Sequence, residues 1–174
     1  MPRAGRQIQR VVLEQAAVLL HPLDVPDEPG VAARQLPGGR RARPAAEPVV
    51  LTDEQKAALL AELPEPYRSA DLERGERLYA MCRSCHTYVP GGANLTGPNL
   101  WGTFDAKAGL VAGYNYSEAL KTSGLVWDAA TMDKWIENPR GLVQGTKMAY
   151  VGMKSPEDRA ALVAWLKVNT SAPE

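Results

Sequence analysis

The feature that most constrains this chain is the run Cys82-Arg83-Ser84-Cys85-His86. Residues three and four apart lie on one face of a helical turn, so Cys82, Cys85 and His86 can meet one flat ligand. Cysteines at this spacing form thioethers with the vinyl groups of haem, and the adjacent histidine offers its imidazole to the iron. The motif therefore predicts one covalent haem c, attached at Cys82 and Cys85, with His86 as a metal ligand.

The same two cysteines would also suit a zinc half-site, a redox dithiol or a structural disulfide. Zinc would need two further ligands, and the only other histidine, His21, lies far back in an arginine- and proline-rich stretch. A redox dithiol should follow a strand in an α/β pattern, which this sequence does not show. A disulfide across two intervening residues would close a very short loop and contribute little. Haem attachment is therefore the favoured interpretation.

Composition and charge exclude several classes of protein. A chain of 174 residues allows one domain with an appendage, or two small domains. Its 20 basic and 20 acidic side chains balance, which leaves no basic excess for nucleic acid. No run of about 18 apolar residues is present, so we expect no membrane span. All four tryptophans lie beyond residue 100 and place the core there: Trp101, Trp127, Trp135 and Trp165.

The first 50 residues have an unusual composition. Arginines precede an apolar stretch that Glu14 and Gln15 interrupt, which makes a poor secretory signal. Haem attachment by this motif normally takes place outside the cytoplasm. Either residues 1–20 act as a degenerate signal, or the written start lies upstream of the real one. We interpret residues 1–50 as a disordered or mis-assigned extension. The stretch from His21 to Pro48 holds too little apolar area to offset its chain entropy.

Residues 51–70 are expected to form a short helix and a linker. Thr52 and Gln55 make a capping box, and prolines end the helix near residue 62. We expect this helix to be exposed or only loosely docked; a partner-binding segment is the alternative.

Three helices are expected in the haem domain, residues 71–170. The first follows Asp71 and leads into the haem motif, the middle one runs from about Ala129 to Asn138 after Asp128, and the last begins at Pro156. The last has Ser155 as its cap, with Asp158 closing a capping box. Two long loops are expected between them, Thr87–Ser117 and Pro139–Lys154. Wrapped around a flat ligand, such loops gain a core they would otherwise lack.

Gly75 lies inside the first of these helices. Glycine there costs about 1 kcal/mol relative to alanine. The expected compensation is a close approach by another helix, which only a missing side chain permits. We predict that the first and last helices cross at Gly75, with Trp165 packed beside it.

The second axial ligand of the iron decides what such a haem can do. No histidine follows His86, so the candidates are three methionines or an open position. Met132 falls on the inward stripe of the middle helix and is interpreted as core. Met153 is interpreted as surface or packing. Met148 lies in a glycine-bearing loop that can approach the haem.

Residues 71–170 resemble a monohaem class I cytochrome c of the mitochondrial and α-proteobacterial kind. The resemblance rests on five segments: Cys82–His86, Thr96–Leu100, Tyr114–Trp127, Glu137–Pro139 and Gly145–Met148. It implies an all-α fold in which helices and long loops wrap one haem c, followed by a tail at residues 171–174.

The resemblance also implies roles for individual residues. Met148 would be the sixth iron ligand, and the Pro98 carbonyl would accept a hydrogen bond from the other ring nitrogen of His86. The remaining cofactor-binding residues would bond the propionates or, together with Pro139, brace the methionine loop: Tyr116, Trp127 and Thr146 for the propionates, and Asn138 for the loop.

The sequence departs from the family at several of these places. Ala106 stands where an arginine near a propionate is usual, Trp135 where a tyrosine is usual and Leu120 where an asparagine is usual. The lysine-rich docking rim is also thin, being reduced to four lysines: Lys107, Lys121, Lys147 and Lys154.

The function implied is that of a one-electron carrier, not an enzyme. It would be a monomer in the periplasm or an equivalent compartment, with a cytochrome bc1-type donor and an oxidase or reductase as acceptor. Two alternatives remain: a haem-bearing subunit tethered to a larger oxidoreductase complex by residues 1–70, and a peroxidase-like enzyme or sensor from whose iron Met148 detaches.

Overall fold

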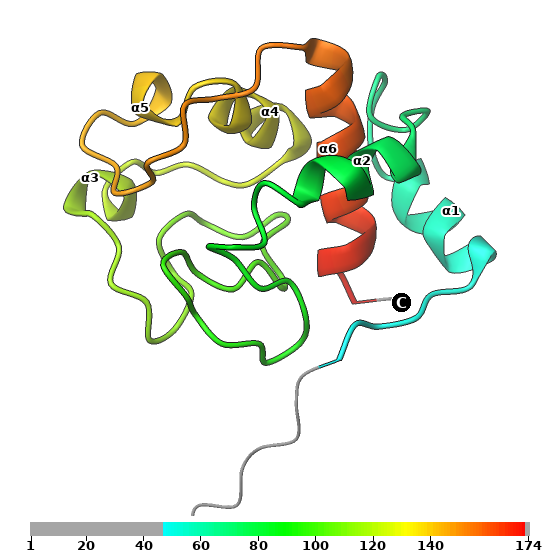
Figure 1. The fold of residues 1–174 in the computed structure, drawn as a ribbon, viewed down its shortest axis with the longest axis horizontal. Coiled ribbons are helices and arrows are strands. Elements are labelled where there is room, and N and C mark those ends of the chain that lie inside the picture. Colours follow the sequence, from blue (N-terminus) through cyan, green and yellow to red (C-terminus); the bar gives the residue numbers. More distant parts are fainter. Residues whose placement is uncertain (1–46, 173–174) are drawn as a thin grey trace, which may run out of the picture. The chain divides into compact units, whose positions relative to one another are not determined.

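The computed structural model describes residues 47–172, which form helices joined by long loops (Figure 1). The helices are α1 (Asp53–Ala61), α2 (Leu72–Tyr79), α3 (Glu118–Lys121), α4 (Ala129–Glu137), α5 (Pro139–Leu142) and α6 (Pro156–Thr170). Within this range the only β-type pairing is an isolated bridge between Lys107 and Val126. The predicted all-α class is confirmed. The interpretation of residues 1–46 and 173–174 concerns parts of the chain outside the described residues.

Side-chain caps start the helices where the sequence predicts. Asp71, Asp128 and Ser155 each accept a hydrogen bond from a backbone N–H in the first turn of α2, α4 and α6. The predicted capping box at Ser155 is wrong in one detail. The Asp158 carboxylate does not return to the cap but forms an ion pair with Arg74 of α2. It thereby links α2 to α6.

Pro139 has two effects on the chain. It ends α4 at Glu137, one residue before the predicted end, because proline lacks the N–H that a continuing helix requires. It then opens α5, where a missing N–H costs nothing at the first position. Asn138 caps this helix, its Oδ1 accepting from the Gly141 N–H at 3.0 Å. The segment predicted as a loop after Pro139 therefore begins with a helical turn.

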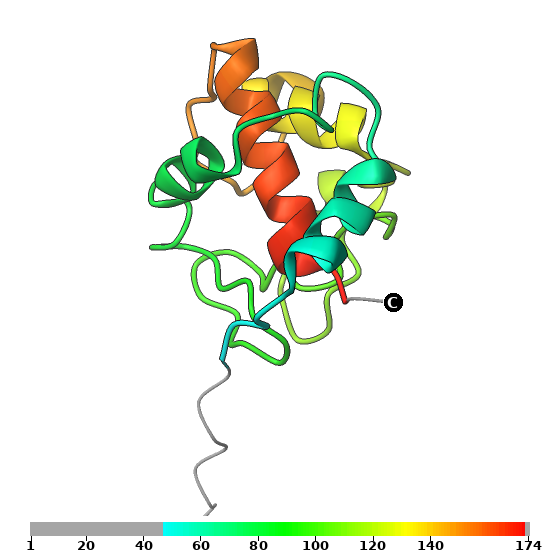
Figure 2. The same cartoon turned by 90° about the vertical axis from the view of Figure 1, so that its right-hand side faces the viewer.

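The predicted crossing of α2 and α6 at Gly75 is confirmed (Figures 1 and 2). A Cβ atom on Gly75 would lie 2.3 Å from the Ala161 carbonyl oxygen and 2.5 Å from the Cβ of Trp165. The Trp165 ring stacks on Tyr79, with ring centroids 4.4 Å apart. The backbones of the two helices can approach this closely only because position 75 has no side chain.

The core is built around α6. Residues in its middle are almost fully inaccessible, with Val163 and Ala164 at 0% exposure. Met132, Trp135 and Ile136 of α4 are buried in the same core, as their helical spacing predicts. No helix among residues 47–172 combines the length and the apolarity that crossing a bilayer requires.

The expectation of an exposed or loosely docked helix α1 is wrong. The capping box of Thr52 and Gln55 is present, but Leu59 of α1 is buried with Leu51 against Val168 at the C-terminal end of α6. Figure 2 shows α1 lying across this end of α6. Leu59 is the only buried residue within α1, and the buried leucines Leu51 and Leu63 flank the helix. Because they form no stripe on the helix, its periodicity did not predict the docking.

We predict that Gly75→Ala destabilises the protein despite the better helix propensity of alanine. The propensity gain is about 1 kcal/mol, whereas forcing a methyl group against the Ala161 carbonyl and Trp165 costs about 1–3 kcal/mol or more. Chemical denaturation should show a net loss in the free energy of unfolding. Glu76→Ala, at the exposed neighbouring position, is the control and should change it by less than about 0.5 kcal/mol. Equal stability of the two variants would contradict the close approach.

Candidate haem site

A cavity of about 560 Å³ lies among the loops, α4 and α6, a size typical of cofactor and ligand sites. Most of the predicted site residues line it: Cys82, Cys85, His86, Pro98, Tyr116, Trp127, Thr146 and Met148. Asn138 does not line it, because this exposed residue caps α5. The structure therefore brings together residues that are far apart in the sequence and leaves Asn138 outside their cavity.

The haem motif follows α2 as consecutive tight turns. The backbone N–H of Cys82 donates to the Tyr79 carbonyl at 2.8 Å, and that of His86 donates to the Cys82 carbonyl at 2.9 Å. The Tyr79 hydroxyl donates to the His86 carbonyl at 2.7 Å. Tyr79, which stacks on Trp165, thus connects the α2–α6 crossing directly to the motif.

The electrostatics of Cys82 argue against a reactive dithiol. Burial raises the pKa of its thiol to about 11, and the neighbouring Cys85 adds to the shift. Redox-active cysteines need a lowered pKa, because the thiolate is the reactive form. Zinc is also not supported, since no group of three His, Cys, Asp or Glu side chains converges anywhere within residues 47–172.

One hydrogen bond holds the His86 ring in its orientation. Its Nδ1 lies 2.7 Å from the Pro98 carbonyl oxygen. A carbonyl can only accept, so Nδ1 carries the proton and Nε2 of the neutral ring keeps its lone pair. Burial lowers the pKa of His86, with the Pro98 bond opposing, which favours this neutral form. The predicted partnership of His86 with Pro98 is present, and it leaves Nε2 available to a metal.

Gly97 is a site residue that the sequence analysis did not single out. A Cβ atom there would lie 2.3 Å from Cε1 of His86 and 2.7 Å from both ring nitrogens. Its backbone N–H donates to the Cys85 carbonyl at 2.8 Å. The segment that carries Pro98 is therefore bound to the motif itself, and the absence of a side chain lets it lie against the imidazole.

The loop that carries Met148 is tied to the Tyr116 segment. The Met148 N–H donates to Thr146 Oγ1 at 3.2 Å. The ammonium group of Lys147 donates to the carbonyls of Asn115 at 2.8 Å and Tyr116 at 3.3 Å. These bonds hold Thr146, Lys147 and Met148 on the side of the cavity that Tyr116 lines.

Two methionines after the motif line the cavity, not one. Met148 is half-buried in its loop, whereas Met132 is buried on α4 and contributes to both the core and the cavity wall. Met153 is buried at 7% exposure and lies outside the lining, which agrees with a packing role. The core interpretation of Met132 is confirmed, but its presence in the wall was not predicted.

The walls suit a large flat apolar ligand with covalent anchors. They are mainly aliphatic and aromatic, and include the edge-to-face pair Trp127 and Trp135, whose centroids are 5.3 Å apart. Ala106 and Leu120, where family members usually have polar side chains, also lie in the wall. Two cysteines and a histidine with a free ring nitrogen meet this space, so the residues present fit haem c.

Comparison with known proteins agrees with this geometry. The family model described as cytochrome c matches residues 72–169. Cytochrome c2 of Rhodomicrobium vannielii is 45% identical over 100 residues, which cover 58% of this chain and 80% of the relative. Cytochrome c of Cochliobolus lunatus is 40% identical over 105 residues, 60% of this chain and 97% of the relative. The solved structure of cytochrome cH from Methylobacterium extorquens superposes with a TM-score of 0.54 at 40% identity, covering 56% of this chain and 98% of that one.

The chain belongs to the cytochrome c family. The predicted class I cytochrome c fold is confirmed by the structural match. Members of this family are electron carriers rather than catalysts and carry one covalently bound haem c, and this chain is a haem c electron carrier of that kind.

We expect Gly97→Ala to disturb the His86 imidazole. The added methyl group would overlap the ring, so the ring must turn away from Pro98 or the loop must move. Denaturation of the haem-loaded protein should show a loss of about 1–3 kcal/mol in the free energy of unfolding, and the visible spectrum should change. Leu95→Ala, at an exposed position nearby, should leave the spectrum as it is. A normal spectrum and stability for Gly97→Ala would contradict the role assigned to this contact.

Proposed function

We propose that Cys82 and Cys85 bind the haem through thioethers and that its iron lies between Nε2 of His86 and the sulfur of Met148. The observation that carries this proposal is the hydrogen bond from His86 Nδ1 to Pro98 at 2.7 Å, on the wall of a cavity that Met148 also lines. This bond fixes both the tautomer and the direction of the ring, as expected of a metal-binding histidine.

Met148 is preferred over Met132 because of where each side chain is held. Met132 is buried at 7% exposure on α4, in contact with the core that α4 shares with α6. Met148 is half-buried in a loop whose polar contacts are to Thr146 and to the Tyr116 segment. A loop residue can approach a bound ligand without unpacking a helix, and the Gly145–Met148 segment matches the family.

The other predicted residues are proposed to orient the haem. Pro98 acts through His86, and Tyr116, Trp127 and Thr146 supply polar hydrogens from the cavity wall to the propionates. Asn138 contributes indirectly: by capping α5 it fixes the start of the loop that leads to Met148. Each of these roles is separable, because the residues come from different segments.

These residues together favour electron transfer over other haem chemistry. When bound, haem c supplies a one-electron Fe(III)/Fe(II) couple. His86 and Met148 would both ligate its iron, which would leave no coordination position for a substrate. The soft sulfur and the apolar walls favour the ferrous form and raise the potential.

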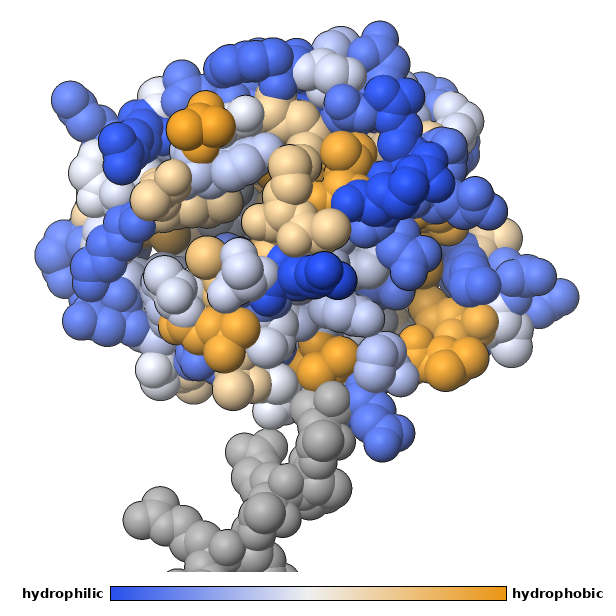
Figure 3. Space-filling view, in the orientation of Figure 1, coloured by the Kyte–Doolittle hydropathy of each residue, from blue (hydrophilic) through white to orange (hydrophobic). Residues whose placement is uncertain are grey.

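Partner binding is proposed to depend on apolar contact more than on charge. Met81 and Leu110 line the cavity and are 52% and 69% exposed. Three of the four rim lysines are bonded within the molecule: Lys121 to Glu118, Lys147 to Asn115 and Tyr116, and Lys154 to Glu137. Figure 3 shows apolar and intermediate side chains distributed over one face of the molecule, with hydrophilic side chains between and around them. A surface with few free lysines steers association with a charged partner less strongly than a lysine-rich surface does.

The proposed setting follows the family. A cytochrome bc1-type complex would donate the electron and an oxidase or reductase would accept it, in the periplasm or an equivalent compartment. The chain would act as a monomer. Its complexes with partners would be weak and short-lived, because a shuttle has to release each partner as readily as it binds.

We predict that Met148→Leu and Met132→Leu differ sharply, although both remove a sulfur from the same cavity with little change in volume. Met148→Leu should abolish the charge-transfer band of the methionine–iron bond in the ferric spectrum. It should also lower the midpoint potential by on the order of 100 mV or more. A visible spectrum and a redox titration measure both effects.

Met132→Leu is the matched control and should keep the band and a potential close to that of the unaltered protein. The opposite pattern would make Met132 the ligand. If neither variant changed the spectrum, the proposed ligation by methionine would be wrong.

A further inference from the structure

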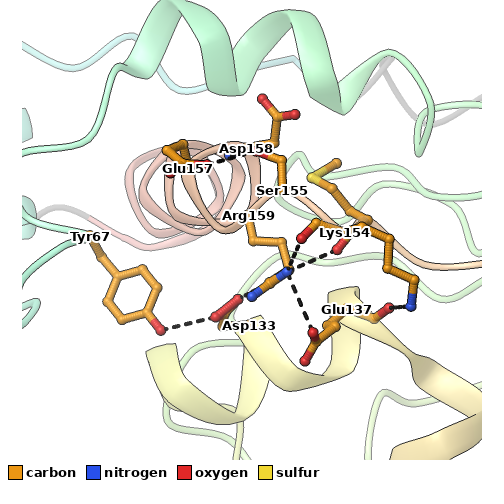
Figure 4. Close-up of polar contacts among 9 residues, drawn as sticks. Tyr67, Asp133, Glu137, Lys154, Ser155, Glu157, Asp158 and Arg159 are labelled. Carbon is orange, nitrogen blue, oxygen red and sulfur yellow. Dashed lines mark hydrogen bonds and ion pairs between the residues drawn. The ribbon is translucent and has the colours of Figure 1, made fainter.

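Arg159 is a buried charged residue that does not line the cavity. It lies on α6 at 8% exposure. Its Nε donates to the carboxylate of Asp133 on α4, and its Nη1 lies 3.7 Å from the carboxylate of Glu137. The same Nη1 donates to two backbone carbonyls, of Met153 at 3.1 Å and Lys154 at 2.9 Å (Figure 4). A guanidinium presents several donors in a fixed plane, which suits such a set of acceptors.

The two carbonyls end the segment that carries Met148. This segment, between α5 and α6, is fixed to α4 at the same place by two further contacts. The Met153 N–H donates to the Ile136 carbonyl at 2.9 Å, and the Lys154 ammonium group donates to the Glu137 carbonyl at 3.2 Å. The end of the methionine loop is therefore held against α4, and Arg159 is the charged group at the centre of these contacts.

Asp133 also connects Arg159 to Tyr67, a residue that lies before the matched family model. Its second carboxylate oxygen lies 3.4 Å from the hydroxyl of Tyr67, which donates to it. Tyr67 is buried at 9% exposure and precedes residues 72–169, the range that the family model matches. Burial and the charge of Asp133 raise the pKa of Tyr67, so its hydroxyl keeps the proton it donates. Figure 4 shows Tyr67, Asp133 and Arg159 in one continuous series.

We propose that Arg159 is a positioning residue that keeps Met148 in place by anchoring the end of its loop, and that Tyr67 supports Arg159 through Asp133. The proposal rests on the ligation of the iron by Met148 given above. Moving the loop away from the cavity requires its carbonyls to leave Arg159. The buried guanidinium group of Arg159 would then keep fewer hydrogen-bond acceptors, which is costly for a buried charge. The anchor thus opposes loss of the methionine ligand, and the segment before α2 contributes to it.

The test uses imidazole as a competitor for the position of Met148. Ferric haem-loaded protein is titrated with imidazole, and loss of the methionine–iron band reports displacement. Arg159→Met keeps the length of the side chain but removes its donors. It should raise the affinity for imidazole by about tenfold or more, the usual worth of hydrogen bonds to a charged group.

Lys167→Met is the matched control. Lys167 is also a cation on α6, its side chain is only 7% exposed, and it pairs with Glu62 at 2.6 Å. It makes none of the contacts that hold the methionine loop, so the affinity for imidazole should stay within about twofold of that of the unaltered protein. Tyr67→Phe removes one hydroxyl and should raise the affinity in the same direction as Arg159→Met, by less.

Amide hydrogen exchange gives a second readout, independent of the iron. The Met153 N–H should exchange faster in Arg159→Met than in Lys167→Met, because its bond to Ile136 lies within the anchored end of the loop. Equal affinities for imidazole in these two variants would overturn the proposal. Should Arg159→Met not fold, Arg159→Lys replaces it. A single ammonium group cannot reach Asp133 and both carbonyls in the geometry of the guanidinium, so an affinity unchanged in Arg159→Lys would overturn the proposal equally.

Failure of the ligation itself looks different. If the unaltered protein lacks the methionine–iron band, the proposed ligation is wrong and the role of Arg159 toward Met148 is overturned with it. If the band is present and is abolished in Met148→Leu, but Arg159→Met leaves the affinity for imidazole unchanged, only the positioning role is wrong.

Discussion

Gly75 sets how closely α2 approaches α6, and the haem motif depends on that distance. The missing side chain lets Trp165 lie beside the α2 backbone and stack on Tyr79. Tyr79 in turn holds the His86 carbonyl through its hydroxyl. The contact between two helices, distant in sequence, therefore continues into the turn that presents the histidine. A cavity lined by loops obtains one rigid wall in this way.

The sequence was sufficient to predict those features of the structure that depend on residues a few positions apart. Asp71, Asp128 and Ser155 were recognisable as caps because a cap and the N–H it binds lie within one turn. The spacing of Cys82, Cys85 and His86 indicated haem attachment for the same reason. Gly75 was informative because an interior glycine is unfavourable unless something approaches it closely.

Features that depend on distant partners were not predictable from local patterns. An arginine within a helical segment is usually solvated, and nothing near Arg159 in the sequence shows that Asp133 and the Met153 carbonyl surround it. Met132 was correctly placed in the core by its periodicity, but periodicity cannot show that a core residue also faces a cavity. The docking of α1 was not predicted because Leu59 is the only buried residue within the helix, whereas Leu51 and Leu63 lie before and after it.

The packing of Leu51 and Leu59 on Val168 shows that the packed structure begins before the matched family model does. The matched family model starts at residue 72, yet the packed structure extends upstream to include Leu51 and Leu59 against Val168 of α6. A fragment that began at residue 72 would expose Val168 of α6 and remove Glu62, the nearer of the two carboxylates that face the ammonium group of Lys167. A fragment cut at the start of the family model would therefore lack part of the packing that covers the C-terminal end of α6.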